Sequence, residues 1–375
     1  MNTTLYDLNR DIIRGQAEKK VLWQPRICAW YDDKRFAGEA LPGKYADCAN
    51  PQQLYEKLGC SDRLYNYFNQ CLEAHIDDSV KIEHIPITDG KTDRDFKRIF
   101  HTPVGDLTEI VYGNESNGGM MPHKWLVTDV EDFKPLCYLE EATTYRFNMD
   151  TYHHFLEQVG HLGLPVIFLP RTNIQKMLIE LCGVENTFYL LADYPEEMER
   201  YFEVLSKSQE GFLKAVADSP IEWINYGDNL HCRILPDYMF EKYILPEYEK
   251  RGDILHKAGK FLFSHWDGDC KNYLKYAKNC FLDGIEAITP TPQGDVTVEE
   301  VKEALGDDIV LIDGIPAVLF QENFPEEMLV EETKKIIDLF AGQLILGISD
   351  EMPSSGLIER VELVNEIVNE HNAKC

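Results

Sequence analysis

The sequence lacks the features that direct a chain into or across a membrane. No stretch of its 375 residues approaches the roughly 20 consecutive apolar residues that a bilayer span requires. Residues 1–20, MNTTLYDLNRDIIRGQAEKK, contain neither the apolar centre of a signal peptide nor a cleavage site. We therefore expect a cytoplasmic protein that does not enter a membrane.

Several common catalytic and cofactor motifs are also missing. The sequence has no GxGxxG, P-loop or GxSxG pattern, so nucleotide binding and serine-hydrolase chemistry have no support. It has no CxxC pair, and its ten cysteines are scattered along the chain. In a cytoplasmic chain of this length, such cysteines are typical of reduced thiols and not of a disulfide framework.

Basic residues are scarce. Lys and Arg number 37 against 65 Asp and Glu, which gives a formal net charge of −28. A surface of this charge repels phosphate backbones and anionic lipid headgroups, so nucleic acids and membranes are not expected partners. A basic protein partner stays possible on charge alone.

The second half of the chain alternates short apolar segments with amphipathic ones. The apolar segments have the length of strands and lie at residues 163–169, 221–226, 260–264, 282–288, 309–312 and 344–346. The segments with helical spacing lie at residues 173–181, 194–216, 236–258 (with a break near Pro246), 272–277, 297–305, 325–340 and 357–369. This alternation predicts a parallel sheet that is buried on both faces.

The first third of the chain gives a weaker pattern. Residues 19–27 are typical of a first strand, residues 47–74 of mostly helical structure, and residues 81–87 and 109–112 of further strands. No Pro- or Ser-rich linker marks a domain boundary. We therefore expect one domain spanning residues 1–375, in which residues 1–120 include an N-terminal extension.

Polar residues follow several of the predicted strands. In barrels of alternating strands and helices, the active site forms where the strands end. That position is occupied by Asp228, Asn229 and His231 after one strand, His265 and Asp267 after the next, Glu286 in the third, Asp313 after the fourth, and Ser349, Asp350 and Glu351 after the last.

The sequence His265-Trp266-Asp267 is the most specific of these features. Residues two apart on an extended backbone point the same way, so this His and this carboxylate could hold one ion. Imidazole and carboxylate both suit zinc. The spacing occurs often by chance, however, and by itself it favours a packed histidine followed by a helix-capping aspartate.

Glu286 and the acidic pair Asp350-Glu351 leave alternatives open. A carboxylate within an apolar strand needs a partner, which for Glu286 is a metal, a basic residue or a substrate donor; alternatively its side chain points outward to a Lys or Arg between the helices. Glu351 is slightly favoured as a helix cap, and Asp313-Gly314 is equally consistent with a turn.

The residues from Gly259 to Ile358 resemble a known family. They include GKFLFSHWDGD, DGIEAITPTPQGDVTVEEVKEALGDDIVLIDGIPA and LILGISDEMPSSGLI. This pattern is similar to the C-terminal half of the uroporphyrinogen decarboxylase superfamily, and the resemblance extends upstream to about residue 120. It implies an α/β fold, namely a (β/α)8 TIM barrel of that superfamily with an N-terminal extension.

The decarboxylase branch of that superfamily fits the sequence poorly. Its members carry an arginine-rich N-terminal loop that clamps the many carboxylates of the porphyrinogen. The corresponding stretch here, residues 24–30, is QPRICAW and contains only Arg26. One arginine in a chain of net charge −28 is poorly suited to an octa-anionic substrate.

The resemblance therefore implies the branch of corrinoid-dependent methyltransferases. The coenzyme M type of that branch binds zinc through His-x-Cys and a distant Cys, whereas this chain has Asp267 and Asp350 where those cysteines are expected. An oxygen-rich zinc site of His265, Asp267, Glu286 and Asp350 resembles the methyltransferases that demethylate methoxylated aromatics in anaerobes. We place Asp228, Asn229 and His231 as catalytic residues beside it.

The implied reaction moves a methyl group from a methoxylated, or N-methylated, small molecule to the cobalt of a corrinoid (cobalamin) carried by a partner protein. Zinc acts in it as a Lewis acid. Two other functions stay open at this point. One is a metal-free lyase of the decarboxylase type, with Asp228 or Glu286 as general acid, and the other is a non-catalytic protein that binds a tetrapyrrole.

Overall fold

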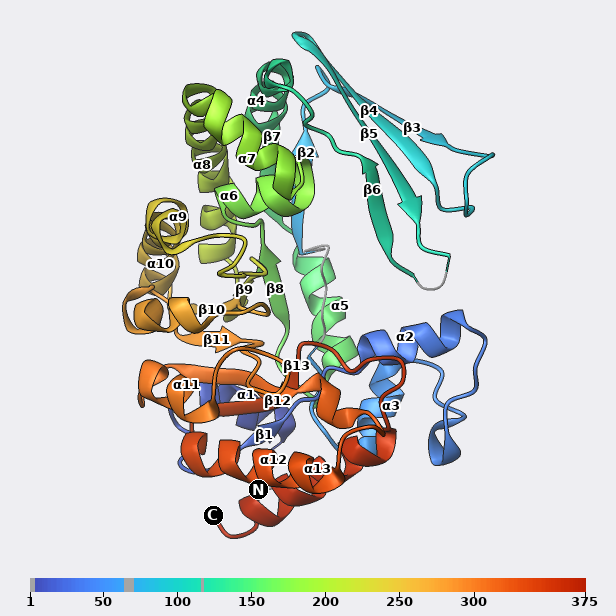
Figure 1. Cartoon of the computed structure of the whole chain (residues 1–375), viewed down its shortest axis with the longest axis vertical. Coiled ribbons are helices and arrows are strands. Elements are labelled where there is room, and N and C mark those ends of the chain that lie inside the picture. Colours follow the sequence, from blue (N-terminus) through green and yellow to red (C-terminus); the bar gives the residue numbers. More distant parts are fainter. Residues whose placement is uncertain (1–3, 64–70, 116–117) are drawn as a thin grey trace. The chain divides into compact units, whose positions relative to one another are not determined.

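The computed structural model describes residues 4–63, 71–115 and 118–375, and these residues form two compact units (Figure 1). Unit 1 comprises residues 1–69, 149–169 and 221–375, and unit 2 comprises residues 70–148 and 170–220. The chain thus leaves unit 1 twice and returns to it. No Pro- or Ser-rich linker in the sequence marks this division. Within the described residues, every helix is too short or too polar to cross a membrane.

A parallel sheet of seven strands forms the centre of unit 1. Its order is β1-β13-β12-β11-β10-β9-β8, and every neighbouring pair is parallel. The strands are β1 (Leu22–Trp23), β8 (Val166–Leu169), β9 (Trp223–Tyr226), β10 (Phe261–His265), β11 (Gly284–Glu286), β12 (Val310–Pro316) and β13 (Leu344–Ser349). All their residues are buried, as the uninterrupted apolar segments of the sequence predicted.

The sheet curls, and the expected alternation of strands and helices is confirmed. An eighth strand is not formed within the described residues. The backbone amides of Ser61 and Asp62 instead donate single hydrogen bonds to the carbonyl oxygens of Trp23 and Leu162. A closed (β/α)8 barrel therefore stays a prediction, whereas the curled α/β sheet is observed.

The helices of unit 1 alternate with its strands along the chain, and several of them pack against the sheet (Figure 1). They are α1 (Leu5–Ile13), α2 (Cys28–Phe36), α3 (Pro51–Leu58), α5 (Met149–Val159), α9 (Asp237–Met239), α10 (Leu245–Lys257), α11 (Val298–Leu305), α12 (Glu326–Phe340) and α13 (Ile358–Asn372). The predicted helix at residues 297–305 begins with a capping box, because Thr297 and Glu300 each accept the other's backbone N–H at the start of α11. The predicted break near Pro246 is also present, where a π-helical turn gives way to α10.

The core of unit 1 lies inside the curled sheet and is closed by α1. Leu8 and Ile12 of this helix pack with inward residues of the strands, among them Trp223, Phe261 and Phe263. Along β10 the inward residues change from Phe261 and Phe263 to His265, because alternate residues share a face. The interior is thus apolar where the strands begin and polar where they end.

Unit 2 contains an antiparallel sheet of order β3-β4-β5-β6 and a two-stranded pair, β2-β7. The strands are β2 (Leu72–Ile76), β3 (Lys81–Pro86), β4 (Phe96–Thr102), β5 (Gly105–Gly113), β6 (Met120–Lys124) and β7 (Thr143–Phe147), and the helices are α4 (Phe133–Glu141), α6 (Asn173–Lys176), α7 (Val184–Asp193) and α8 (Pro195–Ala217). The helical prediction for residues 47–74 was wrong at both ends. Only α3 is helical there, residues 72–74 begin β2, and residues 64–70 lie outside the described part.

Candidate metal centre

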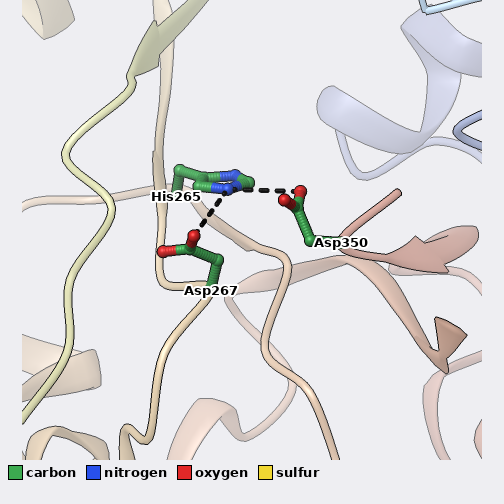
Figure 2. A group of neighbouring side chains, drawn as sticks. All are labelled: His265, Asp267 and Asp350. Atoms are coloured by element: carbon green, nitrogen blue, oxygen red, sulfur yellow. Dashed lines mark ion pairs between the residues drawn. The ribbon is translucent and has the colours of Figure 1, made fainter. Parts of the chain in front are cut away.

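His265 ends β10 and points into the interior of unit 1, where only 5% of its surface is exposed. Its Nδ1 lies 2.6 Å from Oε2 of Glu286, the residue that pairs with it in the neighbouring strand β11. Its Nε2 lies 3.3 Å from Oδ1 of Asp350 and 3.7 Å from Oδ2 of Asp267. Figure 2 shows the two aspartates on the Nε2 side of the ring.

This arrangement gives the imidazole three carboxylate neighbours. Burial by itself would lower the pKa of His265, but the charge of Asp350 and the hydrogen bonds with Asp267 and Glu286 raise it to about 10. The ring is therefore an imidazolium at neutral pH until another cation takes the place of the proton at Nε2.

Glu286 is completely buried, and both of its carboxylate oxygens are held. Oε1 accepts a hydrogen bond from Nη1 of Arg63, and Oε2 accepts one from Nδ2 of Asn225 at 3.0 Å. Burial by itself would raise the pKa of Glu286, but the charges of Arg63 and His265 hold it well below its usual range. Of the two alternatives left open, the structure thus shows the inward one, with a basic residue as a partner, and Glu286 lies on the Nδ1 side of His265, away from the two aspartates.

Arg63 connects Glu286 to a second buried carboxylate, that of Asp313 in β12. Its Nη2 donates to Oδ1 of Asp313 at 2.7 Å, and its Nε donates to Oε1 of Gln24 at 2.7 Å. Asp313 has a φ of +76°, which is strained for a residue other than glycine, and Gly347 in the next strand leaves room for its side chain. Asp313 is therefore not in a turn, which was one of the two possibilities left open.

Arg26 pairs with the last two acidic residues. It lies after β1, and its guanidinium contacts Oδ1 of Asp350 and, at 3.1 Å, Oε1 of Glu351. Burial raises the pKa of Glu351, and the charge of Arg26 opposes this rise without cancelling it. Glu351 thus acts as a partner of Arg26 at the site and not as the cap of α13, whose N-cap is Leu357.

Of the three residues expected to be catalytic, Asn229 contacts the site, whereas Asp228 and His231 have other hydrogen-bond partners. Asn229 has a φ of +50°, and its Nδ2 donates to Oδ2 of Asp267 at 2.9 Å, which joins it to the site. Asp228 is buried and accepts a hydrogen bond from the hydroxyl of Tyr248 at 2.8 Å. His231 is half-buried, and its Nδ1 accepts a 3.4 Å hydrogen bond from the amide of Arg233. No hydrogen bond between His231 and His265 is observed among the described residues of unit 1.

Sequence reasoning missed Arg63 and gave Arg26 no place at the site. Five carboxylates gather here, from Asp267, Glu286, Asp313, Asp350 and Glu351. Negative charges at this density, with Glu286 and Asp313 fully buried, require cations among them. The need for cations was therefore evident from the sequence, but the sequence does not show which of the 37 basic residues supply these cations.

The donor atoms fit a divalent metal. His265, Asp267 and Asp350 each offer one ligand atom, and these atoms lie within 4.8 Å of one another. Histidine ligands commonly donate their second ring N–H to a carboxylate, as Nδ1 of His265 can to Glu286. Three nitrogen and oxygen ligands with room for one more are typical of catalytic zinc sites.

A polar site at the carboxyl ends of a curled parallel sheet is the arrangement typical of α/β enzymes. Comparison with family models is specific: the uroporphyrinogen decarboxylase (URO-D) model matches residues 172–371, more than half of the chain. The chain belongs to this family, and the resemblance seen in its sequence is confirmed.

Several solved structures are similar to this chain, and two of them illustrate the likeness. A methyltransferase from Methanosarcina mazei superposes with a TM-score of 0.58 at 12% identity, covering 98% of this chain and 99% of its own. At that identity the likeness concerns the fold. A putative vitamin-B12 independent methionine synthase from Listeria monocytogenes gives a TM-score of 0.37 at 16% identity, over 60% of this chain and 71% of its own. No curated protein matches the sequence.

Proposed function

We propose that this chain is a metal-dependent methyltransferase that transfers a methyl group from a methoxylated or N-methylated small molecule to the corrinoid of a partner protein. The observation that carries the proposal is the convergence of His265 Nε2, Asp267 and Asp350, with Nδ1 of the same ring held by Glu286. The methyltransferase fold of the Methanosarcina structure is consistent with it.

We assign His265, Asp267 and Asp350 as the residues that hold a zinc ion. When bound there, zinc supplies Lewis acidity toward the heteroatom from which the methyl group departs. In that departure the C–O or C–N bond breaks with both electrons left on the heteroatom, and the corrinoid supplies the electron pair of the new bond.

The residues of the chain supply position and charge. Glu286 fixes the ring of His265, and Asn229 restrains the carboxylate of Asp267. The acidic groups keep the site attractive to a cation, because carboxylates this close repel one another unless a positive charge lies among them. Asp228, held by Tyr248, lies at the end of the neighbouring strand and maintains the loop that carries Asn229.

The test combines metal analysis with a transfer assay. Protein purified without chelator should contain about one zinc per chain, and it should methylate free cob(I)alamin from a panel of methoxylated and N-methylated compounds. His265→Ala should lose the metal and the transfer while remaining folded, because one side chain at a strand end does not determine the core. His256→Ala is the matched control, since His256 also pairs with a carboxylate, Asp283, at 2.9 Å but lies outside the site.

The two variants separate the competing interpretations. A packed histidine without a metal would show the opposite result, with lower thermal stability in His265→Ala and unchanged activity. Methyl transfer that survives complete removal of metal by chelation would reject the proposed role of zinc, whereas a metal-free protein that transfers no methyl group would favour the lyase.

A further inference from the structure

Arg63 is the only group among the described residues of unit 1 that ion-pairs with both Glu286 and Asp313 at hydrogen-bonding distance. The side chains of all three residues are at most 1% exposed. Arg63 lies in the segment after α3, next to Ser61 and Asp62, whose backbone amides bond to Trp23 and Leu162.

The N–H groups of the Arg63 guanidinium point in fixed directions, and each of its nitrogens donates to a different partner atom. Nη1 donates to Oε1 of Glu286 and lies 3.2 Å from Oδ2 of Asp313, Nη2 donates to Oδ1 of Asp313, and Nε donates to Gln24. A planar fork with several donors can satisfy such a set, whereas an ammonium group on a flexible stem cannot reproduce it.

This geometry determines how Glu286 meets His265. With Oε1 held by Arg63 and Oε2 facing Asn225 and His265, the plane of the carboxylate cannot rotate freely. A fixed carboxylate gives Nδ1 of the ring one defined partner and leaves Nε2 directed at Asp267 and Asp350. Without Arg63, Glu286 would retain its contact with Asn225 but could turn about its terminal bond.

We propose that Arg63 is a positioning residue of the metal centre, acting through Glu286 to set the orientation and tautomer of His265. This inference rests on the proposed function, because it assumes that a metal binds at Nε2. Partners that orient a metal-bound histidine typically contribute about 10–100-fold to metal affinity. We expect an effect of that size because Arg63 acts on His265 through Glu286.

Arg63→Lys and Arg63→Met separate orientation from charge. The lysine variant keeps the positive charge and loses the fork, and the methionine variant loses both. If Arg63 positions the site, both variants should bind zinc about 10–100-fold more weakly in competition with a chromophoric chelator. If Arg63 supplies only charge, Arg63→Met should bind zinc more tightly than the wild type and Arg63→Lys should be unchanged, which would overturn the inference.

Arg251→Met is the matched control for loss of a buried arginine. Arg251 is fully buried in unit 1, lies over the ring of Tyr226 and pairs with Glu247. Its replacement should lower stability and leave zinc affinity unchanged. An equal loss of affinity in Arg251→Met would show that the Arg63 effect is only general destabilisation, and would overturn the inference.

A second readout does not depend on affinity or activity. Nitrogen-15 NMR of zinc-loaded protein should show His265 as the Nδ1–H tautomer in the wild type and a mixed or broadened state in Arg63→Lys. If Arg63→Met fails to fold, Glu286→Gln tests the same path, because it weakens the Arg63 contact while keeping an acceptor near Nδ1. An unchanged tautomer in all of these variants would refute the positioning role.

The outcomes also distinguish this inference from the proposed function. A wild-type protein that binds zinc but transfers no methyl group would reject the proposed function and leave the role of Arg63 intact. Zinc binding and transfer that are both insensitive to Arg63 would reject only the positioning role. A wild type that binds no zinc would reject both.

Discussion

Zinc binding at His265 should release close to one proton from the protein at neutral pH. The pKa of His265 is raised to about 10 in the metal-free protein, with Asp350 as the largest contribution that raises it. A metal ion must displace the proton from Nε2. At pH 7 the pH is about three units below the pKa of this group, so the proton is firmly bound. At roughly 1.4 kcal/mol per unit, displacement costs on the order of 4 kcal/mol.

The measurable consequence is a strong pH dependence of metal affinity. Between about pH 7 and pH 9 the affinity should rise close to tenfold per pH unit, because each unit lowers the cost of removing one proton. Calorimetric titrations in buffers with different ionisation enthalpies should give about one proton released per zinc at pH 7.5. NMR of the metal-free protein should show His265 as imidazolium at pH 8.

Asp350→Asn provides the informative variant. Removing this charge should lower the pKa of His265, so fewer protons should be released per zinc at the same pH. The affinity should also fall, because a proposed ligand is lost. A wild-type affinity that is flat from pH 7 to pH 9, with no proton release, would refute the reasoning and show that His265 is neutral before the metal arrives.

Two further predictions concern stability. The folded-state pKa of His265 is raised above its usual 6.5, so its contribution to stability is complete below pH 6.5 and is lost as pH rises through about 10. Urea unfolding with chelator present should therefore show a steeper loss of stability from pH 7 to pH 10 in the wild type than in His265→Gln. Gly347→Ala should cost about 1–3 kcal/mol, because the added Cβ would lie 2.2 Å from Oδ1 of Asp313 and 2.9 Å from the carbonyl oxygen of Gln24. Its control is Gly211→Ala within α8, where a Cβ meets nothing within 4 Å and should add up to about 1 kcal/mol of stability. A Gly347→Ala protein as stable as the wild type would mean that Asp313 does not occupy this space.

The strands of the second half could be predicted from the sequence because each is a short, continuous apolar run. Each of the six predicted segments overlaps one of the strands β8 to β13, although β10, β12 and β13 extend beyond the predicted ends, and the capping box at Thr297 marks the start of α11. The N-terminal third could not be predicted equally well. Residues 72–76 form β2 by pairing with β7, about 70 residues later in the chain. Local periodicity does not reveal a pairing over that distance.

The candidate site was predicted in part. His265, Asp267 and Asp350 were selected because they follow strands, and the structure brings these three together. Glu286 was selected on the same grounds, and the structure places it on the opposite nitrogen of the histidine ring. The position of His231 also could not be foreseen, since the loop after β9 determines where its side chain lies.

The sequence by itself determined the family, the order of strands and helices in its second half, and the residue types available at the strand ends. These properties depend on local composition and on the two-residue period of strands, which the sequence displays directly. Only the tertiary structure decided which charges meet. Arg63 and Glu286 are separated by 223 positions and Arg26 and Asp350 by 324, so their pairing exists only after the sheet curls. Burial then makes these contacts strong, because charges removed from water must be compensated by whatever partners the fold brings within reach.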